Sequence, residues 1–93
     1  MRTPVVFEWD TVKAESNLAK HGVRFEVATS VFEDPDVADF DASRVDDGEE
    51  RRKAVGMIQD SLFTVVYTVR GKVMRIISAR LSNATEKRRH ADG

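Results

Sequence analysis

Three β-rich runs follow one another in the second half of this 93-residue chain with almost no sequence between them. The runs are RRKAVGMIQ (51–59), LFTVVYTVR (62–70) and KVMRIISAR (72–80), and only DS and G separate them. Such short breaks leave room for tight turns alone, because a parallel connection needs a crossover of roughly a dozen residues. The runs therefore predict a three-stranded antiparallel meander.

The segment before the meander begins with a strand and a clearly delimited helix. VVFEW (5–9) is β-branched and aromatic, which is typical of a strand. Asp10 can accept hydrogen bonds from the first turn of a helix over 11–21, and Gly22 supplies the left-handed residue at which such a helix ends. The sequence thus predicts a strand followed by a capped helix.

The rest of the chain predicts three short elements and one loop. Apolar residues at helical spacing indicate a second helix over 25–34, and the alternation in 36–41 indicates a short strand. Residues 42–50 are acidic and are predicted to form a mobile loop. Asn83, with Glu86 three residues later, matches a capping box that begins a last helix. The order β-α-α-β-β-β-β-α predicts an α+β fold with helices on one face of an antiparallel sheet.

The turns of the meander determine which residues share a face of the sheet. With two-residue turns at 60–61 and 71–72, opposed residues point to the same side. One side is apolar and is predicted to be the core face beneath the helices: Ile58, Phe63, Val65, Tyr67, Val69, Met74 and Ile76. The other side is called the outer face. It carries a polar row across three strands, which consists of Lys53, Thr68 and Arg75. Arg51 and Arg70 lie near this row, and the apolar end of the face consists of Val55, Val66 and Ile77.

The basic residues of the outer face suit a nucleic-acid backbone. A guanidinium presents a planar fork that matches phosphate oxygens. Arg75 is the strongest candidate, because it interrupts a strand that is otherwise apolar. The alternative interpretation is a solvated strand face whose charges bind nothing.

The net charge of −1 hides a segregation of charge along the chain. Residues 1–32 balance, residues 33–50 hold nine acids and one base, and residues 51–93 hold ten bases and three acids. A basic half beside an acidic segment indicates a polyanion-binding protein, although the two segments can also pair with each other in the fold.

Several classes of site have no support in the sequence. The chain has no cysteine, and its two histidines lie 69 positions apart, so no metal site is predicted. There is no Gly-rich phosphate loop, no nucleophile motif and no apolar run of the roughly 18 residues that a membrane span needs. We expect a single soluble domain over 1–93, without a cofactor, in a reducing compartment such as the cytoplasm.

Lys20 and His21 stand together at the end of the predicted 11–21 helix. Two interpretations are open. Positive side chains at this position offset the negative end of the helix dipole, so the pair can be a plain helix stop. Alternatively the imidazole is catalytic, since histidine exchanges protons near neutral pH more readily than other side chains.

Several motifs together resemble the BrnT toxin family. They are FEWD (7–10), NLAKHGV (17–23), Phe25, Ala28, VFEDP (31–35), GEER (48–51), VVYT (65–68), RIISAR (75–80) and an ExRR pattern at 86–89. Each motif alone is weak, but their order spans nearly the whole chain, and KHGV followed by RIISAR is the most specific part. The sequence departs from the family at Thr11, Lys53, NATE (83–86) and His90.

The resemblance implies a RelE-like fold, with N-terminal helices packed on an antiparallel sheet. It implies a ribonuclease toxin of a type II toxin–antitoxin system, which cleaves mRNA and stops translation and growth. The implied partner is a BrnA-like antitoxin with a ribbon-helix-helix domain, in a 2:2 complex. Operator DNA is then bound only through the antitoxin, and no membrane takes part.

The chemistry of RNA cleavage without a metal assigns roles to these residues. The reaction needs a base for the attacking 2′-hydroxyl, an acid for the leaving 5′-oxygen and cations for the added negative charge. The predicted catalytic set consists of His21, Glu50, Arg51, Arg75 and Arg80. The predicted RNA-binding set consists of Lys20, Lys53, Thr68 and Arg70.

Structural interpretations compete with these assignments. Glu50 can merely pair with the arginines at 51–52, and Arg80 can tie the last helix to the sheet. Trp9 is expected in the core rather than as a stacking platform for a base, and His90 is expected at the surface.

Two other functions are compatible with the sequence. The first alternative is a non-catalytic interaction module, in which the apolar end of the outer face anchors a partner peptide or helix. A regulator that binds operator DNA on its own is weaker, because the chain has a net charge of −1 and no helix-turn-helix signal.

Overall fold

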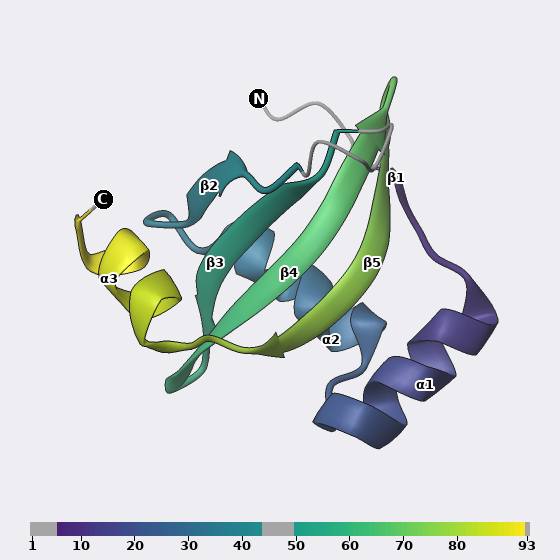
Figure 1. Cartoon of the computed structure of the whole chain (residues 1–93), viewed down its shortest axis with the longest axis horizontal. Helices are drawn as coiled ribbons and strands as arrows, with labels where there is room; N and C mark the ends of the chain where they lie inside the picture. Colours follow the sequence, from purple (N-terminus) through teal and green to yellow (C-terminus); the bar gives the residue numbers. More distant parts are fainter. Residues whose placement is uncertain (1–5, 44–49, 93) are drawn as a thin grey trace.

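A computed structural model describes residues 6–43 and 50–92, and Figure 1 shows the arrangement of its elements. In chain order they are β1 (Val6–Glu8), α1 (Thr11–His21), α2 (Phe25–Ala28), the 3-10 helix η1 (Thr29–Glu33), β2 (Ala38–Asp41), β3 (Arg52–Ile58), β4 (Ser61–Arg70), β5 (Val73–Leu81) and α3 (Ala84–Asp92). The predicted α+β class is confirmed. The second helix, predicted over 25–34, is α-helical only in its first part and continues as the 3-10 helix η1. Most of the predicted acidic loop, 44–49, lies outside the described residues.

The five strands of the described residues form one sheet in the order β1-β5-β4-β3-β2. The meander β3-β4-β5 is antiparallel as predicted, and β2 pairs with β3 in the same way. β1, however, runs parallel to β5. The predicted antiparallel sheet is therefore confirmed except at this edge, where the long chain between β1 and β5 permits a parallel pair.

One of the two predicted turns is shifted. Arg70 faces Val73, so the β4–β5 turn is 71–72 as predicted. Ile58 faces Ser61, which places the β3–β4 turn at 59–60, one residue early. Gln59 takes the positive φ of 55° in this turn.

The shifted turn changes which residues are opposed but not which face they occupy. Lys53 pairs with Val66 instead of Thr68. The displacement amounts to two positions along β4, and side chains alternate with a period of two, so Lys53 stays on the outer face. The row predicted from Lys53, Thr68 and Arg75 is thus wrong in its first member.

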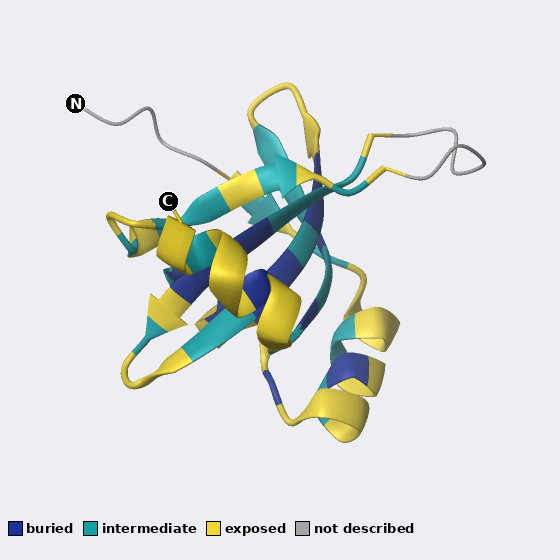
Figure 2. Ribbon diagram, turned by 60° about the vertical axis from the view of Figure 1, so that its left-hand side comes forward, coloured by how far each residue is buried: buried dark blue, intermediate teal, exposed yellow. Residues whose placement is uncertain are grey.

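The core forms where η1 and α2 cover the core face of the sheet. Phe25, Ala28 and Val31 are fully buried against the strands, and Trp9 packs edge-to-face on Phe25 at 5.9 Å between ring centroids, as expected of a core residue. Figure 2 shows the buried residues concentrated in the central strands. Of the seven predicted core-face residues, six belong to this core, but Val69 is 50% exposed near the end of β4.

The helices do not all lie on one face, contrary to the prediction. η1 packs on β3 and β4, whereas α3 packs on β3 from the outer face. The side of α3 follows from Glu86, which bonds Lys53 and Thr64. These two residues alternate with buried core-face residues along their strands, so they point away from η1.

Local capping signals are confirmed at the three helix ends where they were predicted. Asp10 accepts hydrogen bonds from Val12 N at 2.8 Å and Lys13 N at 3.1 Å, and Gly22 ends α1 with φ 71°. Asn83 and Glu86 form the reciprocal capping box, with both bonds at 2.9 Å. None of the helices within the described residues has the length and apolar character to cross a membrane.

Candidate nucleic-acid interface

A polar row crosses the outer face of the meander. Thr68 faces Arg75 across β4 and β5, as predicted. The Thr68 hydroxyl also donates to the Glu50 carbonyl at 2.8 Å, which fixes the start of β3 against β4. Continuing the observed register from β3 places Arg51 opposite Thr68. Arg51 itself directly precedes β3, so the row consists of the paired Thr68 and Arg75, with Arg51 beside them at the entry to β3.

Arg75 keeps a solvent-facing guanidinium in this row. Its Nη1 lies 3.0 Å from Glu8 Oε1, because Glu8 is its neighbour in the parallel β1–β5 pair. The two side chains are 35% and 44% exposed, so water screens their attraction. A phosphate can therefore compete with Glu8 for this arginine at low cost.

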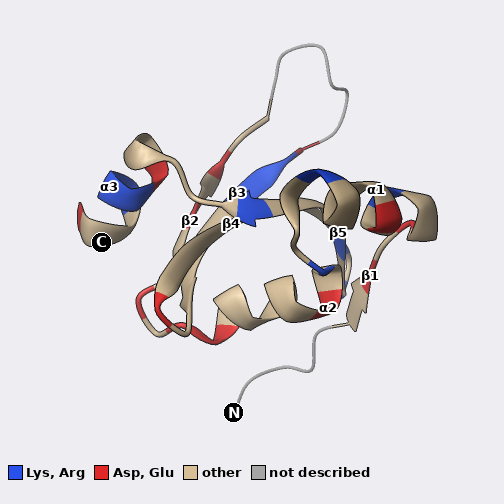
Figure 3. Cartoon of the chain, turned by 90° about the horizontal axis from the view of Figure 1, so that it is seen from below, with Lys and Arg blue, Asp and Glu red and all other residues tan. Residues whose placement is uncertain are grey.

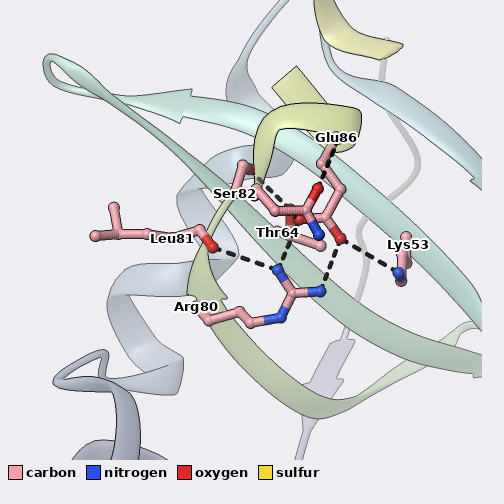
Figure 4. Close-up of polar contacts among 7 residues, drawn as sticks. Lys53, Thr64, Arg80, Leu81, Ser82 and Glu86 are labelled. Carbon is pink, nitrogen blue, oxygen red and sulfur yellow. Dashed lines mark hydrogen bonds and ion pairs between the residues drawn. The ribbon is translucent and has the colours of Figure 1, made fainter. Parts of the chain in front are cut away.

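Arg80 and Lys53 occupy a different environment beneath α3. Arg80 presents both Nη atoms to the Glu86 carboxylate, at 2.6 and 2.7 Å, and Lys53 Nζ lies 3.2 Å away from it (Figure 4). The Glu86 side chain is only 3% exposed. Arg80 therefore ties the last helix to the sheet, which is one of the two roles predicted for it.

Hydroxyl and amide groups complete the surroundings of Glu86. Thr64 donates to it at 3.0 Å, the Asn83 N–H donates at 2.9 Å, and Ser82 lies 2.8 Å from the Thr64 hydroxyl. Burial by itself raises the pKa of Glu86, but the hydrogen bonds from Arg80, Asn83, Thr64 and Lys53 outweigh it and lower the pKa to about 2. Glu86 is a buried carboxylate that stays ionised.

Asn17 is the residue that the sequence analysis did not single out. Its amide oxygen accepts from Ala79 N at 3.1 Å, and its amide nitrogen donates to the carbonyls of Ala79 and Val23 at 2.8 and 3.0 Å. β1 pairs with β5 only as far as Arg75, so Asn17 takes the place of a strand at the open edge beyond it. The contact joins the NLAKHGV segment directly to RIISAR.

A small hollow of about 190 Å³ lies between α1 and β5, next to this contact. It is lined by Lys13, Ser16, Asn17, Lys20, His21, Ile77 and Ser78. The wall on β5 is irregular because a bulge leaves Ile77 between two paired residues. His21 and Lys20 are exposed at the end of α1, so the structure brings both interpretations together: the helix ends here, and its last side chains border a polar hollow.

The motifs united by Asn17 agree with a comparison to known families. Residues 9–86 match the family model described as "Ribonuclease toxin, BrnT, of type II toxin-antitoxin system". The chain belongs to the BrnT family. No individually curated protein matches it. Membership makes it a ribonuclease toxin of a type II system at the level of the family, with an antitoxin as partner.

The sheet of this BrnT chain is consistent with the RelE-like fold that the resemblance implied. Two predicted site residues lie at strand ends: Glu50 just before β3, and Arg70 at the end of β4. Glu50 is exposed beside the polar row and joined to it through its carbonyl, and Arg70 is exposed at the end of β4. Arg52 points to the other face and pairs with Asp39 at 2.8 Å, so it is not the partner of Glu50.

His90 of the BrnT chain lies beyond the matched residues, and its predicted surface position is wrong. Its side chain is 15% exposed, and Nε2 lies 2.8 Å from Asp34 Oδ2. The N–H of Met57 donates to the same carboxylate at 2.7 Å and is the main reason that the pKa of Asp34 is lowered. Within 6–43 and 50–92, no three His, Asp or Glu side chains gather in a way that could hold a metal ion.

Proposed function

We propose that this BrnT toxin is a metal-independent endoribonuclease that cleaves mRNA and thereby inhibits translation and growth. The observation that carries the proposal is the pair of Thr68 and Arg75 on adjacent strands of the outer face, with a water-screened guanidinium at Arg75. A phosphodiester laid across this row meets the fork of Arg75, whereas the buried Thr68 hydroxyl is bonded to the Glu50 carbonyl and supports the strands beneath it.

The cleavage step moves the 2′-oxygen onto the adjacent phosphorus while the bond to the 5′-oxygen breaks. A base takes the proton of the 2′-hydroxyl, an acid returns one to the leaving oxygen, and cations offset the added charge. We assign the proton transfers to His21 and Glu50, and the stabilisation of charge to the arginines of the catalytic set: Arg51, Arg75 and Arg80.

The remaining polar residues are proposed to hold the RNA. Lys20 extends the site along the hollow beside α1, and Thr68 and Arg70 extend it along β4. Lys53 is paired with Glu86 in the absence of RNA and belongs to the same face. The path proposed for the RNA runs over the outer face and around the open edge of β5 to this hollow.

The partner of the toxin is proposed to be a BrnA-like ribbon-helix-helix antitoxin in a 2:2 complex, through which alone operator DNA is bound. The proposal places the protein in the cytoplasm, acting as one domain over 1–93. It is supported by family membership, which implies an antitoxin. A short neighbouring reading frame that encodes a ribbon-helix-helix protein is the expected genetic context, and copurification of its product tests the pairing.

Arg75→Ala is the variant that tests the nuclease. We expect purified wild-type protein to cut single-stranded RNA in the presence of EDTA and to arrest growth when expressed, and Arg75→Ala to lose at least about tenfold of the cleavage rate. Arg24→Ala is the matched control, because Arg24 precedes α2 away from the outer face. Circular dichroism must show both variants folded, and equal cleavage by Arg75→Ala and wild type would defeat the assignment.

The interaction-module alternative loses its proposed anchor. Val55 is fully buried, and Val66 and Ile77 are half-buried, so the apolar end of the outer face is not available to a partner. We therefore favour the nuclease. Purified protein that binds the antitoxin yet leaves RNA intact would reverse this preference.

A further inference from the structure

α3 contributes no buried apolar side chain to its attachment. Its only buried residue is Glu86. Its other described attachments are His90 on Asp34 and the Arg89 guanidinium 4.2 Å above the Phe40 ring. Figure 2 shows the C-terminal helix exposed almost throughout. A terminal helix that buries none of its own apolar side chains opens at lower free-energy cost than a helix of the core.

The groups around Glu86 match those that bind a phosphate. Arg80 supplies a bidentate fork, Lys53 supplies a point charge, and Thr64 supplies a hydroxyl. Arg and Lys with hydroxyl donors are the usual partners of phosphate oxygens. In the protein alone, the Glu86 carboxylate provides the anion for this cradle, which Figure 4 shows.

The cradle lies on the same face as the row that includes Arg75. Thr64 faces Arg80, and four residues further along β4 Thr68 faces Arg75. At about 3.3 Å per residue the two pairs are roughly 13 Å apart, a distance that a short single-stranded segment spans. An RNA strand that engages Arg75 can therefore reach the cradle along β4.

We propose that Lys53, Thr64 and Arg80 form a second phosphate-binding site for RNA, which Glu86 occupies until RNA displaces it together with α3. This inference moves Arg80 from the scissile phosphate, to which the proposed function assigns it, to a neighbouring phosphate of the same strand. The inference rests on the proposed nuclease function and adds its regulation. The exchange is chemically balanced, because one anion replaces another at the same donors and the released carboxylate becomes solvated. α3 is then a polar latch over part of the substrate path.

Hydrogen exchange on the unmodified protein tests the latch directly. The probe is a 2′-O-methyl RNA oligonucleotide, which lacks the attacking hydroxyl and stays intact. We expect saturating probe to speed amide exchange in α3 by roughly fivefold or more, a size typical of coupled equilibria. Unchanged or slower exchange in α3 would overturn the inference, and no variant needs to fold for this result.

Glu86→Gln supplies the second measurement. The amide keeps the shape and the capping box but removes the competing charge, so we expect roughly tenfold tighter binding of the same probe. Glu33→Gln is the control, because it makes the same change in net charge at an exposed residue of η1 on the opposite face. Equal affinities of the two variants would refute the cradle.

Cleavage of ordinary RNA by the same preparations separates the two proposals. Wild-type protein that cuts RNA, with no gain in affinity for Glu86→Gln, rejects the cradle and leaves the nuclease in place. Wild-type protein that does not cut, while Glu86→Gln gains affinity over Glu33→Gln, rejects the nuclease and supports the cradle.

Discussion

At the scale of single residues, the side chain of Asn17 makes the hydrogen bonds that a neighbouring strand would otherwise make with β5. The open edge of β5 leaves the N–H and C=O of Ala79 without a neighbour, and a buried main-chain group that loses its hydrogen bond costs free energy. The Asn17 amide satisfies both groups and also the carbonyl of Val23. One side chain thereby fixes α1, the turn after it and β5 relative to each other.

Asn17→Ala should therefore destabilise the fold. We expect a loss of about 3 kcal/mol in the free energy of unfolding, because buried groups on two segments lose their partner at once. Urea denaturation measures it. Ser16→Ala, one position away on the exposed side of α1, should change stability by less than about 0.5 kcal/mol. Equal effects of the two substitutions would contradict this role for Asn17.

Gly56 shows a second constraint at this scale, which is space rather than hydrogen bonding. A Cβ added there would lie 2.5 Å from the Val31 carbonyl oxygen and 2.9 Å from Val31 Cβ. Gly56→Ala must push η1 away from β3, and we expect a loss of roughly 2 kcal/mol or more in urea denaturation.

Gly22→Ala provides the comparison for Gly56→Ala. Gly22 has φ 71° with nothing within 4 Å of an added Cβ, so the cost there is backbone strain alone, roughly 1 kcal/mol. A smaller loss for Gly56→Ala than for Gly22→Ala would show that η1 yields easily.

Which residues were predicted from sequence follows from how far apart their partners are. Asp10 and the capping box of Asn83 and Glu86 bond within three positions, so the sequence pattern identified them. Asn17 bonds Ala79 across 62 positions, and no local pattern carries that information. The sequence allows Arg80 either to bind phosphate or to tie the last helix to the sheet, but only the packing of α3 on β3 shows the ion pair.

At the scale of elements, α3 depends on an ionised Glu86. Its pKa is lowered from the ordinary 4.5 to about 2, so the folded state prefers the charged form. The stabilisation from this group is complete above pH 4.5 and is lost as the pH falls toward 2. Acid should therefore weaken the attachment of α3 by protonating the carboxylate between Arg80 and Lys53.

Glu86→Gln should flatten this acid dependence. We expect the wild type to lose unfolding free energy more steeply than the variant between about pH 4.5 and pH 2 in urea titrations. The variant keeps a residual slope, since the pKa of Asp34 is also lowered, mainly by the Met57 N–H. Parallel curves for the two proteins would mean that Glu86 does not contribute to stability in its charged form.

Strand existence was easier to predict than strand register. The two short breaks in the meander required hairpins, and both formed. The sequence DS at 60–61 suggested the first turn, but Gln59 adopts a positive φ and moves the turn to 59–60. The predicted faces of the side chains remained correct because the register was displaced by two positions, which is one full period of the strand. The parallel β1 and the position of α3 depend on long-range packing and left no periodic signal.

At the scale of the whole molecule, the distribution of charge matters more than its sum. Figure 3 shows Lys and Arg on β3, β5 and α3, Asp and Glu on α2 and on neighbouring segments, and both signs of charge on α1. This segregation was visible in the sequence. The sequence did not show whether the basic residues are available to a ligand. Glu86 and Glu8, which pair with Arg80 and Arg75, come from separate elements that approach the outer face only in the fold.

The salt dependence of RNA binding tests this distribution as a whole. Each phosphate contacted by a single strand contributes about −0.7 to the slope of the logarithm of the association constant against the logarithm of salt concentration. We expect Arg75→Ala to make the slope shallower by about 0.7 with the 2′-O-methyl RNA probe, whereas Arg24→Ala should leave it unchanged. Fluorescence anisotropy between low and physiological salt measures both slopes. An identical slope for Arg75→Ala and wild type would mean that the RNA does not follow the outer face, since a net charge of −1 by itself favours no contact with a polyanion.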